Sequence, residues 1–126
     1  MVDLTPLIPQ GRQVVEGYGP GRFRVSGQVH QGAILVLPTR TLAWPVAAVE
    51  AVTFDSLAAI VASAREVELL LLGTGKRLLP PPPGLRAALK AAGIALEAMD
   101  SGAACRTYNV LMAEGRLVAA ALLPVD

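Results

Sequence analysis

Cysteine and histidine are nearly absent from this chain of 126 residues, which has one of each. A single cysteine, Cys105, excludes an internal disulfide and fits a reducing compartment, so we expect a cytoplasmic protein. His30 and Cys105 lie far apart and give no ligand spacing for zinc or iron, and we predict neither a metal nor another cofactor. A cysteine nucleophile also needs a base, and no motif surrounds His30. These shortages favour a role other than catalysis.

Aromatic residues make up only 4% of the chain and the net charge is +1, so neither stacking surfaces nor a basic field favour binding to nucleic acid. Apolar residues reach 53%, but runs such as 117–123 are about a third of a bilayer span, which predicts no integral membrane segment. No signal peptide is apparent in residues 1–6. The apolar surplus predicts a sheet buried on both faces, together with an interface for a protein partner, of which a second copy of the chain is one candidate.

The chain is long enough for one domain, which we place at residues 13–126 after an extended N-terminal arm at residues 1–12. The first part of the domain has a β pattern with turn signals between short apolar runs. The expected strands are 13–18, 23–25, 33–37 and 41–44. Short connections predict antiparallel pairing.

Helical and extended segments alternate after Pro45. Asp55 and Ser56 are candidate caps of a helix with apolar positions at 57, 60, 61 and 64, and Gly93 is placed to end a helix over 84–92. Further expected elements are strands at 67–72, 94–98 and 116–123, a polyproline connection at 80–83 and a helix at 101–113. This alternation is typical of βαβ units. The predicted fold is therefore a single α/β domain, an antiparallel β portion followed by βαβ units.

Two strand exits are candidate contact sites. The motif Gly73-Thr74-Gly75-Lys76 follows one strand, but it lacks the spacer of a phosphate-binding P-loop; a sharp turn and a ligand contact are the two interpretations. Ser101 opens a helix, where it either caps the backbone or helps to hold an anion. If the two strands are parallel neighbours, Thr74 and Ser101 should lie within roughly 10 Å, with a shallow polar crevice between the loops.

Polar side chains follow in the predicted helix 101–113. Arg106 and Asn109 are three residues apart and share a face, where they either grip a partner or pin the adjacent loop. Tyr108 is expected on the core face. Cys105 lies near the helix start, where the dipole lowers a thiol pKa, but its small neighbours favour a buried, inert residue.

The segment Ala104-Cys105-Arg106-Thr107-Tyr108-Asn109, together with Leu71-Leu72-Gly73-Thr74-Gly75, resembles a small family of uncharacterised bacterial and archaeal domains. Its eukaryotic relatives include a mitochondrial assembly factor for respiratory complex I and an adipogenesis-associated protein. The resemblance covers roughly residues 13–124, with Ser101 where the family usually has Thr. It implies a three-layer α/β domain with a mixed central sheet.

Two functional hypotheses follow. The first is a non-enzymatic interaction module, with assembly or biogenesis of a membrane or respiratory complex as the role that the resemblance implies. The alternative is a protein that binds a small molecule or anion, or an enzyme, with a crevice at the carboxyl edge of the sheet. The candidate contacts are Gly73, Thr74, Gly75, Ser101, Arg106 and Asn109.

Overall fold

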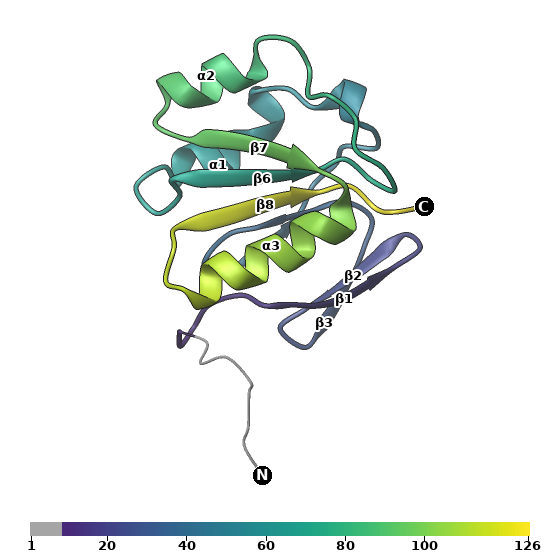
Figure 1. Cartoon of the computed structure of the whole chain (residues 1–126). Coiled ribbons are helices and arrows are strands. Elements are labelled where there is room, and N and C mark those ends of the chain that lie inside the picture. Colours follow the sequence, from purple (N-terminus) through teal and green to yellow (C-terminus); the bar gives the residue numbers. More distant parts are fainter. Residues whose placement is uncertain (1–8) are drawn as a thin grey trace.

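The computed structural model describes residues 9–126 (Figure 1). Most of the predicted arm, residues 1–8, lies outside the described residues. At the start of the described part the backbone N–H of Arg12 donates to Pro9 O at 3.2 Å, and the chain enters the domain from this turn.

The central sheet has five strands in the order β5-β4-β8-β6-β7. Its strands are β4 (Ile34–Val36), β5 (Thr41–Ala43), β6 (Leu69–Gly73), β7 (Ala95–Met99) and β8 (Val118–Leu122). β6 is parallel to both of its neighbours, whereas β4 is antiparallel to β8 and to β5. The prediction of a mixed sheet in an α/β domain is confirmed.

A separate antiparallel meander is formed by β1 (Val15–Gly19), β2 (Arg22–Val25) and β3 (Gln28–Gln31). β3 was not predicted from the sequence, because Gln-Val-His-Gln has one apolar residue and gives little alternation. The β portion of the chain is thus divided between two sheets, since β4 and β5 join the central one.

The helices are α1 (Ala58–Ala62), α2 (Leu85–Ala91) and α3 (Ser101–Ala113), with two 3₁₀ turns, η1 (Val49–Ala51) and η2 (Asp55–Leu57), before α1. The prediction that Asp55 or Ser56 caps the first helix is wrong, since α1 has no side-chain cap. The Ser56 hydroxyl accepts instead from Thr53 N and its own N–H donates to Thr53 Oγ1, because the chain turns there before the helix begins. Gly93 does end α2, with φ +86°.

The connections around β6 place helices on both faces of the sheet. The chain passes from β6 through α2 to β7, then reverses through α3 to β8 on the far side of β6. Right-handed crossovers in opposite directions put α2 and α3 on opposite faces, as Figure 1 shows. Leu70 and Leu72 accordingly pack with α1 and α2, and Leu71 packs with α3 and the meander. The sheet is buried on both sides, in three layers.

Among residues 9–126, no helix has both the length and the apolar character needed to cross a membrane.

Candidate functional site

The exits of β6 and β7 lie side by side at the carboxyl edge of the sheet. The two strands are parallel neighbours, with Gly73 opposite Met99. Backbone hydrogen bonds then join the two loops, from Thr74 N to Met99 O at 2.9 Å and from Ser101 N to Gly75 O at 2.8 Å. The structure therefore brings together Gly73, Thr74, Gly75 and Ser101. The adjacency of the two loops agrees with the sequence analysis.

Ser101 does not cap α3, which corrects one of its two predicted roles. The cap is Asp100, whose Oδ1 accepts from Ala103 N at 2.9 Å. Ser101 is the first helical residue, and its side chain is fully buried. Its hydroxyl accepts from Gly75 N at 2.9 Å and donates to the carbonyl of Leu123, just beyond β8. One hydroxyl thus links the exits of β6, β7 and β8.

Glycine is required at positions 73 and 75 for two different physical reasons. A Cβ at Gly73 would lie 2.8 Å from Ser101 Oγ and 2.9 Å from Leu122 Cδ2, so only glycine allows this close approach. Gly75 has φ +100°, a backbone conformation that side chains strongly disfavour. These positions shape the junction from within the fold.

Thr74 fixes the loop that leaves β6. It is 5% exposed, and its Oγ1 lies 2.8 Å from Arg77 O and 3.2 Å from Met99 O, either of which can accept its proton. The same oxygen accepts from Leu79 N at 3.0 Å. Among residues 9–126, no fully buried side-chain nitrogen or oxygen is left without a partner. The polar groups expected to line a crevice are therefore engaged with one another, and ligand binding there stays a prediction.

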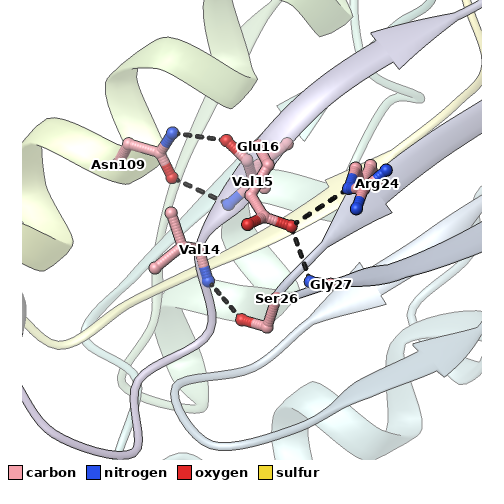
Figure 2. A network of polar contacts seen from close by, with 7 residues as sticks. All are labelled: Val14, Val15, Glu16, Arg24, Ser26, Gly27 and Asn109. Carbon is pink, nitrogen blue, oxygen red and sulfur yellow. Dashed lines mark hydrogen bonds and ion pairs between the residues drawn. The ribbon is translucent and has the colours of Figure 1, made fainter.

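Asn109 and Arg106 lie away from this junction, on the side of α3 that meets the meander. The Asn109 amide donates to Val15 O at 2.7 Å and accepts from Val15 N at 3.0 Å, as Figure 2 shows. Such a paired contact imitates the bonds of a neighbouring strand. The Arg106 guanidinium donates to Tyr18 Oη at 3.3 Å and remains exposed. The six candidate residues thus divide between two places in the fold.

Further polar contacts close the start of the meander (Figure 2). Val14 N donates to Ser26 Oγ at 3.0 Å, and Gly27 N donates to Glu16 Oε1 at 2.6 Å. Arg24 Nε lies 3.6 Å from the same carboxylate oxygen. These residues were not predicted from the sequence, because their partners are 8–12 residues away in a meander whose third strand has no clear pattern. The Ser26-Gly27 turn was the one available signal.

Cys105 and Tyr108 belong to the core between α3, the sheet and the meander. Burial raises the pKa of the Cys105 thiol to about 12, which outweighs the lowering effect of Arg106. Burial also raises the pKa of Tyr108, whose hydroxyl donates to Gln13 O at 2.8 Å. Both groups are therefore neutral near pH 7 and unsuited to nucleophilic catalysis. Within residues 9–126, no cluster of three potential metal-binding side chains occurs.

The fold and the polar junctions define a small three-layer α/β domain in which α3 binds a β meander to a mixed sheet. The chain belongs to the family described as "Protein of unknown function (DUF498/DUF598)", whose model matches residues 15–123.

Proteins similar to this chain include an uncharacterised bacterial protein and assembly factors of animals. An uncharacterised protein of Rhodobacter capsulatus is 44% identical over 91% of this chain and 87% of that protein. The NADH dehydrogenase [ubiquinone] 1 alpha subcomplex assembly factor 3 of Danio rerio is 37% identical over 88% of this chain. The chain spans only 64% of that assembly factor.

Solved structures share the fold. A Bordetella pertussis protein described as an Mth938-like domain has a TM-score of 0.83 and 32% identity, over 99% of this chain and 94% of that chain. This likeness covers the meander as well as the central sheet. The predicted resemblance is confirmed.

Proposed function

We propose that the protein is a non-enzymatic interaction module that supports the assembly of a membrane-bound respiratory complex. The observation that carries this proposal is the similarity to complex I assembly factors, at 37% identity in Danio rerio and 31% in Homo sapiens, over 88% and 87% of this chain. The matching region covers nearly the whole domain of this chain. The shared activity is then contact between this domain and a subunit or intermediate.

The chemistry of the interior supports a binding role. The polar side chains of Thr74, Ser101 and Asn109 form hydrogen bonds within the fold. Burial keeps the pKa of the Cys105 thiol high. Arg106 is the candidate residue whose charged side chain faces solvent, next to the half-exposed Tyr18 ring. We propose that this pair belongs to a partner-binding surface where α3 meets the meander.

The test is deletion of the gene in its own organism, followed by separation of membrane complexes on a native gel with an in-gel NADH dehydrogenase stain. We expect less assembled enzyme and an accumulation of smaller intermediates, both restored by the intact gene. The Arg106→Ala protein should restore less than the Arg116→Ala protein, which removes an exposed arginine in the loop after α3. An unchanged amount of assembled enzyme in the deletion strain would contradict the proposal.

A further inference from the structure

The four consecutive prolines between β6 and α2 form a preset extended segment. Each of residues 79–82 precedes a proline, which restricts its backbone to the extended region, and the ring of each proline fixes its own φ. No cis peptide bond occurs in residues 9–126. The segment 79–83 is thus a short polyproline II helix. It ends in a turn, where Gly84 has φ +82° and Leu85 N donates to Pro82 O at 3.3 Å.

One edge of this helix rests on the protein and another is left open. With three residues per turn, Leu79 and Pro82 share one edge and are half-buried, and Leu79 packs against the core. Pro80 and Pro83 share a different edge and are exposed. Leu78, immediately before the segment, is 61% exposed. The open edge is therefore apolar and already in an extended conformation.

Thr74 holds the start of the segment in place. Its hydroxyl oxygen accepts from Leu79 N and lies within hydrogen-bonding distance of Arg77 O, as described above. Beside the prolines runs an apolar groove of about 470 Å³, lined by residues 79–83 with Val49 and Glu50. The polyproline segment is consequently positioned by the same junction that joins β6, β7 and β8. Because the segment is already ordered, a partner that binds it pays little conformational entropy.

The proline-rich composition of this segment indicates the kind of partner surface that would bind it. Extended proline helices are recognised by grooves lined with aromatic side chains. A second copy of this chain is a poor source of such a groove, because Phe23, Trp44 and Tyr108 are buried. The two exposed aromatic residues, Tyr18 and Phe54, line separate pockets. Lys76 and Arg77, just before the prolines, are both exposed. Their charges favour a partner with acidic side chains at the corresponding end of its own groove.

We propose that Leu78, Pro80 and Pro83 form a docking ridge for a different protein with an aromatic-lined, acidic-flanked groove. This inference rests on the proposed function only in requiring that the chain acts through protein contact. It names the surface and the chemistry of one partner.

The experiment is a titration of the full-length, ¹⁵N-labelled protein with a purified SH3 domain as a surrogate groove, followed by amide NMR shifts. We expect shifts at the amides of Lys76, Leu78, Leu79 and Gly84. The double variant Pro80→Ala/Pro83→Ala should weaken binding by about tenfold or more, the loss typical of removing interface anchors. The matched control Pro20→Ala/Pro45→Ala replaces two exposed prolines elsewhere and should bind as the unaltered protein does.

The charge-reversal variant Lys76→Glu/Arg77→Glu keeps every proline and provides an independent test. We expect weaker binding that added salt no longer weakens, because salt screens the new repulsion from acidic side chains. Absence of shifts at these amides, or equal binding by the two proline variants, would refute the proposal that this ridge is a docking surface. Failure here is separable from failure of the assembly role. A Pro80→Ala/Pro83→Ala protein that binds the SH3 domain as the unaltered protein does and restores assembled NADH dehydrogenase in the deletion strain would refute the ridge and leave the assembly role standing.

Discussion

Gly73 and Ser101 are in such close contact that the position of Ser101 leaves no room for a side chain at position 73. A Cβ at position 73 would lie 2.8 Å from Ser101 Oγ and 3.0 Å from Ser101 Cα. The second of these atoms belongs to the backbone of α3 and cannot move alone. The end of β6 and the start of α3 are therefore packed as one unit, although Gly73 and Ser101 are 28 positions apart in the sequence.

The first prediction concerns this contact. Gly73→Ala should lower the free energy of unfolding by about 1–3 kcal/mol, because the added methyl forces the helix start away from the strand. Chemical denaturation measures the change. Gly17→Ala is the matched control, since a Cβ at this strand glycine meets nothing within 4 Å. The control should be neutral or stabilising by about 0.5–1 kcal/mol. Equal losses in both variants would refute the role of the contact.

The second prediction concerns the Ser101 hydroxyl. Ser101→Ala should cost about 1–3 kcal/mol, because it leaves Gly75 N and Leu123 O without their buried partner. Hydrogen exchange should show faster exchange at the Gly75 amide. Ser63→Ala, at the half-buried end of α1, should change stability by less than about 0.5 kcal/mol. An unaltered Gly75 exchange rate would show that water replaces the hydroxyl.

Local patterns in the sequence were sufficient to predict most of the central sheet and its helices. The helix over 101–113 matches α3, because a small polar start and a Glu-Gly-Arg stop mark its ends. The prediction of Ser101 as the cap was wrong, because Asp100 and Ser101 are adjacent and both residue types cap helices. Ser101 lies one position inside the helix and bonds the loop of another strand, which only the folded chain reveals.

Contacts between distant segments were outside the reach of local patterns. Asn109 and Val15 are 94 residues apart, and their paired hydrogen bonds depend on where the meander docks. The sequence indicated that Asn109 bonds something, since asparagine is a poor helix former. It did not indicate that β1 to β3 form a sheet of their own, because pairing between short strands is decided by packing against α3.

The third prediction follows from that contact. Asn109→Ala should destabilise the protein by about 1–2 kcal/mol, since both polar backbone groups of Val15 lose their partner. The amide of Val15 should exchange faster while the amides of β6 keep their protection. Val110→Ala is the control, because that side chain is 56% exposed on the same helix and should have little effect. Uniform loss of protection across both sheets would contradict a local attachment role.

The fourth prediction concerns alkaline pH. Burial raises the pKa of Cys105 from an ordinary value of 9.0 to about 12, so between these values the folded state holds a proton that the unfolded state has lost. Stability should therefore be independent of this group below about pH 8 and should fall as the pH rises through 9 toward 12. Cys105→Ala should reduce that slope and cost less than about 1–2 kcal/mol near pH 7. The remaining slope should include Tyr108, whose pKa burial also raises.

Thiol reactivity provides a second measurement of the same environment. At pH 8 the folded protein should react with a thiol reagent much more slowly than the protein in denaturant, because a buried thiol ionises little and is poorly accessible. Equal rates in the two states would show that Cys105 is accessible. We also expect Cys105 to be dispensable for partner binding, and loss of binding in a folded Cys105→Ala protein would contradict this expectation.

The last prediction separates attachment from recognition at Arg106. Its hydrogen bond to Tyr18 Oη is exposed and 3.3 Å long, so Arg106→Ala should change the free energy of unfolding by less than about 1 kcal/mol. If Arg106 contacts a partner, the folded variant should fail to retain proteins that the unaltered chain captures from extracts of its own cells, and should restore less assembled NADH dehydrogenase. Arg116→Ala is the control, because Arg116 is also exposed and lies 3.5 Å from the Glu68 carboxylate in an equally weak surface pair. A lowered melting temperature with capture intact would assign Arg106 to holding the meander. An Arg106→Ala protein that matches the unaltered chain in stability, capture and complementation would refute both roles.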